Sequence, residues 1–135
     1  MVAVDGSERS LRTAQRAIEY ARMMGGSVVM VHVIQLPEYL SEDVLKKMSQ
    51  ELAKRAEGAF VSAVKLAADS GVKVETKSLE TTGSVVAAIC DAASSERISL
   101  LVVGTRTTRD VTKLMLGSVA EGVIATAKCD VLVVR

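Results

Sequence analysis

The chain has 135 residues, the size of one domain, and a chain of this length buries about two-thirds of its unfolded surface. Seventeen Lys and Arg against sixteen Asp and Glu give a net charge of +1, which favours neither nucleic acid nor an acidic membrane as a partner. With two Tyr, one Phe and no Trp, the chain lacks the aromatics of a base-stacking surface and predicts an aliphatic core.

The sequence shows no signal of membrane insertion or secretion. Its longest uncharged stretch, Met23–Pro37, is interrupted by glycines and is too short to cross a bilayer of about 30 Å. No basic leader precedes the N-terminal apolar residues, so no secretion signal is expected. Cys90 and Cys129 are expected to be free thiols in a reducing cytosol. These features predict a cytoplasmic protein.

Short β-rich runs alternate with helical patterns along the whole chain. In chain order they predict a strand at Val2–Asp5, a helix at Glu8–Met24, a strand at Ser27–Ile34, a helix at Ser41–Ser70, a strand at Val72–Leu79, a helix at Ser84–Glu96, a strand at Ile98–Val103, a helix at Gly117–Ala127 and a strand at Val131–Arg135. This alternation is typical of an α/β domain whose parallel strands are joined by right-handed connections.

The apolar residues indicate how the strands are covered. Residues 100–103 and 131–134 are apolar at consecutive positions, which marks strands with helices on both faces. The third predicted strand is partly alternating and charged, as expected at a sheet edge. The first has only four residues before Asp5, so we expect the native chain to begin a few residues before Met1.

Ligands of open parallel sheets bind at the carboxyl ends of the strands, where the chain direction switches, so the loops after Val4, Val33 and Val103 form the candidate site. After Val4, a carboxylate ends the strand, Gly6 permits a turn and Ser7 can cap the following helix. Asp5 either accepts hydrogen bonds from ligand hydroxyls or is satisfied by the backbone of its own turn, and the sequence leaves both interpretations open.

The segment from Gly104 to Ser118 carries the ingredients of a phosphate site. It starts with a glycine at a strand end, continues through basic and hydroxyl residues, and ends in Gly117-Ser118 at a predicted helix start. Glycine permits close backbone approach, arginine and hydroxyls donate, and a helix N-terminus adds unpaired amides. Because no Walker motif is present, the alternative is a solvated loop with a serine cap.

Three further residues favour structural roles. His32 is the only histidine, and a lone imidazole in an apolar strand is expected to be packed and hydrogen-bonded rather than catalytic or metal-bound. Cys90 and Cys129 are expected to be buried small hydrophobes rather than redox sensors.

Taken together, the motifs of this chain resemble the universal stress protein family over essentially its whole length. They are Val4-Asp5-Gly6-Ser7, Val31-His32-Val33, a glycine before the third predicted helix, Val103-Gly104, Gly117-Ser118-Val119-Ala120-Glu121 and Cys129-Asp130-Val131-Leu132-Val133-Val134. The resemblance implies one domain over residues 1–135, with a doubly wound, Rossmann-like sheet of the adenine nucleotide alpha hydrolase type. Its five parallel strands would stand in the order three-two-one-four-five, flanked by four helices.

The resemblance also implies a homodimer formed largely through the C-terminal strand Val131–Arg135, and a role in stress survival. Many members of the family bind ATP through a Gly-x-x-Gly, nine residues and Gly-Ser or Gly-Thr. By resemblance, Gly104, Gly117 and Ser118 match this motif, Asp5 and Val33 lie by the ribose and adenine, Arg106 lies by the phosphates, and Val119 lies behind the Gly-Ser turn. Thr107 stands at the second glycine position, where a Cβ costs about 1–2 kcal/mol if the backbone needs a positive φ, although its hydroxyl is also a donor.

The leading hypothesis is a stress-response module that binds ATP with Mg²⁺, or a related adenine nucleotide, as a regulatory ligand. The alternative, motivated by Thr107, is a family member that binds no nucleotide and acts through dimer and protein-partner contacts. A slow ATPase or nucleotide-dependent transferase with Mg²⁺ on Asp5 ranks last, because the sequence offers no nucleophile–base pair, no paired catalytic acids and no metal cluster.

Overall fold

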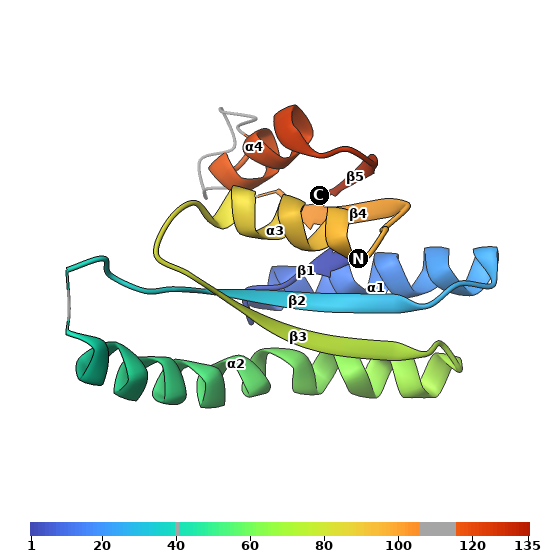
Figure 1. Ribbon diagram of the computed structural model, residues 1–135. Helices are drawn as coiled ribbons and strands as arrows, with labels where there is room; N and C mark the ends of the chain where they lie inside the picture. The colour runs from blue at the N-terminus through green and yellow to red at the C-terminus, as the bar shows by residue number, and fades with distance from the viewer. Residues whose placement is uncertain (40, 106–115) are drawn as a thin grey trace, which may run out of the picture.

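The computed structural model describes residues 1–39, 41–105 and 116–135, in which strands and helices alternate (Figure 1). The elements are β1 (Val2–Ala3), α1 (Glu8–Met24), β2 (Val28–Gln35), α2 (Glu42–Ser70), β3 (Val74–Thr81), α3 (Val85–Ser95), β4 (Leu100–Gly104), α4 (Ser118–Thr126) and β5 (Asp130–Val134). The strands form one sheet in the order β3-β2-β1-β4-β5, and all neighbours are parallel. The doubly wound α/β sheet and its strand order are confirmed, as are the four predicted helices within the described ranges.

Helices cover both faces of this sheet. α1 and α2 pack on one face, around Ile18, Met30 and Phe60, and α3 and α4 pack on the other, around Val31, Ile89 and Leu101. Adjacent residues of β2 therefore enter opposite cores, which is why the central strands are apolar at consecutive positions. The core is aliphatic as predicted, apart from Phe60.

The first strand is shorter than predicted, because the chain turns immediately after Val4. Hydrogen bonds nevertheless tie residues 1–4 to both neighbours: the Met1 amine donates to Leu100 O at 2.8 Å and the Val4 amide to Val31 O at 2.9 Å. β1 is therefore central despite its length. β3 runs two residues past the predicted end at Leu79, because its register with β2 continues to the Gln35–Thr81 pair.

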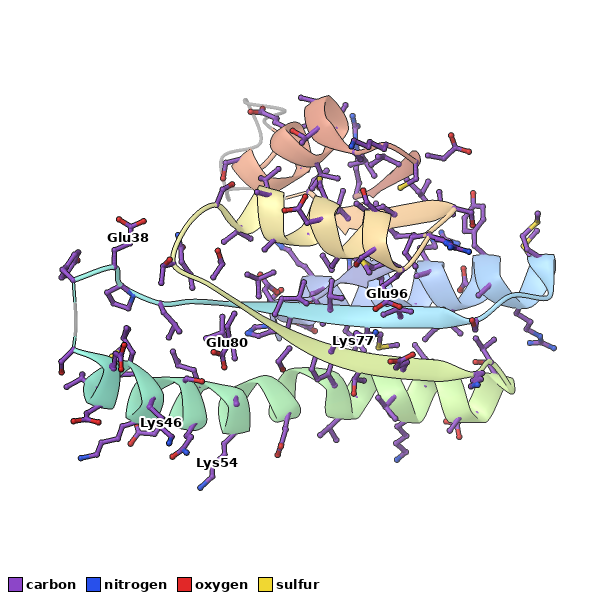
Figure 2. The ribbon with its side chains drawn as sticks, viewed as in Figure 1. Glu38, Lys46, Lys54, Lys77, Glu80 and Glu96 are labelled. Atoms are coloured by element: carbon purple, nitrogen blue, oxygen red, sulfur yellow. The ribbon has the colours of Figure 1, made fainter. Side chains whose placement is uncertain are left out.

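Charged side chains line the edge strand β3. Lys77 forms ion pairs with Glu75, at 3.2 Å between Nζ and Oε1, and with Glu96 at the end of α3 (Figure 2). Hydrogen bonds that the Lys77 ammonium donates to Glu96 and then to Glu75 raise the pKa of Lys77. The predicted edge position of this strand is confirmed. Its fixed charges make the edge resist pairing with a strand of another chain.

The remaining structural expectations concern the cysteines and the membrane. Cys90 is buried and Cys129 is half-buried, and both are free thiols. Burial raises the pKa of the Cys90 thiol, so this group is held in its neutral form. None of the helices in the described ranges is long and apolar enough to pass through a bilayer.

Close packing of α3 against α4 depends on Gly122. A Cβ at this position would lie 2.6 Å from Val86 Cγ2 and 3.3 Å from Val86 Cβ. Because the nearest obstacle is a β-branched side chain whose own Cβ is close, rotation of Val86 alone does not create the missing space.

We expect Gly122→Ala to destabilise the protein by about 1 kcal/mol net, because overpacking costs about 1–3 kcal/mol and exceeds the helix-propensity gain of about 1 kcal/mol. Chemical denaturation measures the change. Gly58→Ala in α2 is the matched control, since its Cβ meets nothing within 4 Å, and it should stabilise. Adding Val86→Ala should rescue part of the loss at Gly122. Equal stabilisation by both single substitutions would show that α3 and α4 separate freely.

Candidate functional site

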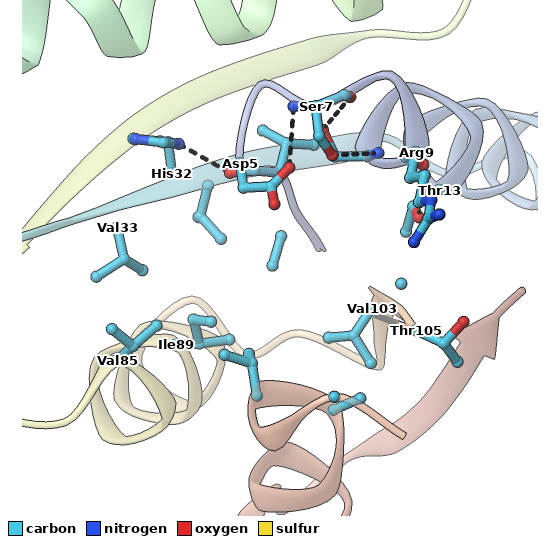
Figure 3. Close-up of a pocket in the computed structure, with 18 of the residues that line it drawn as sticks. Asp5, Ser7, Arg9, Thr13, His32, Val33, Val85, Ile89, Val103 and Thr105 are labelled. Atoms are coloured by element: carbon cyan, nitrogen blue, oxygen red, sulfur yellow. Dashed lines mark hydrogen bonds between the residues drawn. The ribbon is translucent and has the colours of Figure 1, made fainter. Parts of the chain in front are cut away.

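A cavity of about 550 Å³ opens at the carboxyl ends of β1, β2 and β4 (Figure 3). After β3 the chain crosses over β2 and β1 to form β4 on the other side of the sheet, and the cavity lies at this switch point. Open parallel sheets bind ligands at such a position. Its volume is within the range of about 300–1,000 Å³ that small-molecule sites occupy.

Six of the eight predicted site residues line this one cavity: Asp5, Val33, Gly104, Gly117, Ser118 and Val119. They come from the β1–α1 turn, β2, the end of β4 and the start of α4, and the parallel sheet brings these segments to one edge. The other two, Arg106 and Thr107, lie outside the described residues.

The cavity changes character from one end to the other. Val33, Val85 and Ile89 form an apolar wall at one end, whereas Arg9, Thr13 and Thr105 lie at the opposite end (Figure 3). Asp5 and Ser7 stand between the two ends. The cavity therefore suits an elongated ligand with an apolar group at one end and an anionic group at the other.

Asp5 is held by the turn that follows it. Gly6 adopts a φ of +77°, and the Ser7 amide donates to Asp5 Oδ1 at 3.0 Å. Ser7 then caps α1, since its hydroxyl accepts from the Ser10 amide at 3.2 Å. In Figure 3 the second Asp5 carboxylate oxygen points into the cavity. One oxygen thus serves the turn while the other faces the space that a ligand would fill.

The Asp5 carboxylate is in its ionised form at neutral pH. Partial burial raises the pKa of Asp5, but hydrogen bonds from Ser7 and Ser10 outweigh this effect and bring the pKa below its ordinary value. The cavity therefore presents a negative charge that accepts hydrogen bonds at its midpoint.

The start of α4 offers the opposite electrostatics. Its N-cap is Gly117, which makes no side-chain cap bond, and Gly117, Ser118, Val119 and Ala120 all line the cavity. The first amides of a helix have no intrahelical acceptor, and the N-terminal end of the helix dipole is positive. An uncapped helix start facing a cavity is suited to an anion such as phosphate.

Gly104 has a packing role that the motif alone does not reveal. A Cβ here would lie 2.6 Å from the Thr13 hydroxyl, and this buried hydroxyl donates to Arg9 O at 3.2 Å. Gly104 therefore lets the end of β4 approach α1 closely.

His32 lines the cavity and supports the strand end that carries Asp5. Its Nδ1 lies 2.9 Å from Val4 O, and because a carbonyl only accepts, Nδ1 carries the proton. The ring also meets Phe60 edge-on, with centroids 6.4 Å apart. His32 is packed and hydrogen-bonded, as predicted, and it anchors the residue directly before Asp5.

Several lining residues were absent from the sequence-based prediction. Arg9 and Thr13 stand four residues apart on α1, and Val85 and Ile89 stand four residues apart on α3. The i, i+4 spacing at the start of the helix after Val4, a candidate strand end, could have pointed to Arg9 and Thr13. The helix α3 follows β3, whose end was not a candidate, so no such signal was available for Val85 and Ile89. Which helix faces meet across the cavity depends on the packing of the sheet, which the sequence pattern does not specify.

The chain is similar over its whole length to known proteins of one family. The profile of the universal stress protein family matches residues 1–135. A universal stress protein of Thermus aquaticus is 35% identical over 136 residues, covering 100% of this chain and 96% of the relative. The structure of a universal stress protein in complex with cAMP is 28% identical with a TM-score of 0.74, covering 99% of this chain and 95% of that one. The complex of the Archaeoglobus fulgidus universal stress protein with dAMP is 25% identical with a TM-score of 0.73, covering 99% and 94%.

The Asp5 charge should contribute to stability in a pH-dependent way, which Asp5→Asn tests because asparagine keeps an acceptor for the Ser7 amide. Since folding lowers the Asp5 pKa, the charge stabilises fully above the unfolded pKa of about 3.9 and loses its effect as the pH falls through the folded pKa. Urea denaturation should therefore show a difference between wild type and Asp5→Asn that is constant from about pH 8 to 5 and shrinks below about pH 4.

The size of this difference should stay below about 1 kcal/mol, because Asp5 is exposed and water screens its charge. Asp91→Asn, at an exposed carboxylate on α3 away from the turn, is the control. The same difference at pH 3 and pH 7 would contradict a stabilising role of the Asp5 charge.

Proposed function

The chain belongs to the universal stress protein family, and we propose that it is a stress-response module of that family which binds an adenine nucleotide as a regulatory ligand. The observation that carries this proposal is that three kinds of surface line one cavity. An apolar wall, an ionised carboxylate and an uncapped helix start lie at the strand ends, and they suit a base, a ribose and a phosphate respectively.

Each part of the nucleotide has a matching part of the wall. The adenine would lie against Val33, Val85 and Ile89, and the ribose hydroxyls would donate to the Asp5 oxygen that faces the cavity. The phosphates would accept from the α4 amides and the Ser118 hydroxyl, with Val119 behind the turn. Roles for Arg106 and Thr107 rest on the sequence motif alone.

The ligand class is supported by the solved relatives, since the two described above hold cAMP and dAMP, both adenine nucleotides. ATP with Mg²⁺ is the form that the motif favours. Among the described residues, no group of three or more His, Cys, Asp or Glu side chains could hold a metal ion, so Mg²⁺ would enter bound to the phosphates.

Regulation requires that the nucleotide bind two states of the protein with different affinities, so that its presence shifts their populations. The state that the nucleotide favours would then bind protein partners with a different affinity. The free thiols Cys90 and Cys129 suit a reducing compartment, and the proposal accordingly places the protein in the cytoplasm.

A second candidate function is favoured by Thr107, which stands where nucleotide-binding members carry the second glycine of the motif. In that case the chain binds no nucleotide and acts only through its dimer and its protein partners.

The dimer part of the proposal rests on β5. This strand pairs with β4 on one side only, and Val131, Leu132, Val133 and Val134 are half-buried. An apolar edge strand is a ready template for pairing with another chain. A second copy adding its own β5 would cover this edge, whereas the opposite edge at β3 is charged.

Nucleotide binding is tested on protein purified without added nucleotide, by chromatography of what is released on denaturation and then by calorimetric titration with ATP and Mg²⁺. We expect bound adenine nucleotide or a micromolar Kd. Asp5→Ala should weaken binding about tenfold or more, because hydrogen bonds to a charged group contribute about 1.5–3 kcal/mol. Asp91→Ala on α3 should leave the affinity unchanged.

Thr107→Gly separates the two candidate functions. Binding that occurs only in Thr107→Gly would establish that the native chain has lost the nucleotide function. If neither protein bound an adenine nucleotide, the proposed ligand would be wrong.

The dimer is tested with proline substitutions at the two sheet edges. The backbone groups of successive residues in a strand point to opposite sides. In β5, Val134 O accepts from the Thr105 amide, so the neighbouring Val133 amide points away from the sheet. In β3, Thr81 O accepts from the Leu36 amide, so the Ser78 amide, an odd number of residues away, also points outward. We expect light scattering to give twice the chain mass for wild type and for Ser78→Pro, and a monomer for Val133→Pro, since proline is tolerated at outward edge positions but cannot donate. A dimer that persists in Val133→Pro would exclude β5 pairing.

A further inference from the structure

We propose that Arg9 is a specificity-determining residue that contacts the outer phosphates of the nucleotide, so that the chain prefers adenosine di- and triphosphates to the monophosphate. This inference rests on the proposed function and names the ligand class of the same cavity more narrowly.

The position of Arg9 in the cavity is the first argument. Arg9 is the second residue of α1, and Figure 3 shows its guanidinium beside Thr13, at the end of the cavity formed by Thr105 and far from Val33. If the base lies against Val33 and the ribose against Asp5, a phosphate chain that passes the start of α4 extends toward this end.

The backbone of Arg9 is held close to the β4 end of the cavity, from which its side chain could reach the outer phosphates. Arg9 O accepts from the Thr13 hydroxyl at 3.2 Å, and Thr13 is only 2% exposed. Gly104 at the end of β4 packs directly against that hydroxyl, since a Cβ there would lie 2.6 Å from it. The start of α1 is therefore held at a set distance from the β4 end of the cavity, and Arg9 is carried by a rigid support.

The charges of the wall are the second argument. Asp5 and Glu8 both line the cavity and oppose each negative charge that is added to a ligand. The α4 N-terminus can offset a single phosphate, but a dipole end equals only about half a charge. Arg9 is the single arginine or lysine among the described lining residues. A guanidinium pairs with phosphate oxygens through two parallel hydrogen bonds, so it is suited to the additional phosphates.

The location of Arg9 in the sequence adds a third argument. Arg9 lies on α1 and outside the Gly104–Ser118 motif, so its contact does not depend on the residue at the second glycine position. A phosphate contact from α1 would compensate for the presence of Thr107 in that motif.

The test compares ATP and AMP by calorimetry, both with Mg²⁺, on wild type, Arg9→Ala and Arg12→Ala. Arg12 is the matched control, because it is an exposed arginine of α1 that does not line the cavity. We expect Arg9→Ala to raise the Kd for ATP about tenfold or more and the Kd for AMP less than about threefold. Arg12→Ala should leave both Kd values near wild type.

Arg9→Lys is the second variant, since it keeps the charge and the helix propensity while losing the planar fork, and its ATP affinity should be intermediate. If Arg9→Ala matched Arg12→Ala while wild type bound both nucleotides, the inference would be overturned and the proposed function would stand. Equal losses for ATP and AMP in Arg9→Ala would also overturn it. If wild type bound neither nucleotide, the proposed function would fall together with the inference.

Discussion

The close approach of α1 to β4 is the constraint on which the cavity depends. Thr13 is buried with its hydroxyl satisfied by Arg9 O within the helix, and Gly104 has no side chain to hold the two elements apart. A larger residue at either position would push α1 away from the end of β4. The β1–α1 turn and the start of α4 would then no longer face the same space. A packing requirement between helix and sheet thus decides the width of the candidate site.

Charge is distributed around this space in a way that the local structure explains. The Asp5 carboxylate is ionised because the turn beginning at Gly6 directs the amide and hydroxyl of Ser7 toward it. The uncapped start of α4 provides the positive end of a helix dipole a short way along the wall. His32, by donating to Val4 O, holds the strand end from which Asp5 projects. Acceptor and donor regions therefore have separate structural supports.

Much of the fold could be predicted from the sequence, because burial on both faces of a parallel sheet leaves a strong pattern. Consecutive apolar residues at 100–103 and 131–134 marked strands that pack on both faces, and the charged run ending at Leu79 marked an edge. The bounds were less accurate at β1 and β3. The end of β1 is set by a turn and the end of β3 by its register with β2, and neither depends on hydropathy.

The sequence by itself determined the order of elements, the strand ends at which polar residues gather and, through the motif beginning at Gly104, the kind of ligand to consider. Only the tertiary structure decided which side chains share one cavity. Arg9, Thr13, Val85 and Ile89 carry no motif of their own. They belong to the site because the helices pack on opposite faces of the sheet with their first turns at the same edge. That arrangement follows from side-chain contacts between elements distant in sequence, and the local pattern of residues does not contain it.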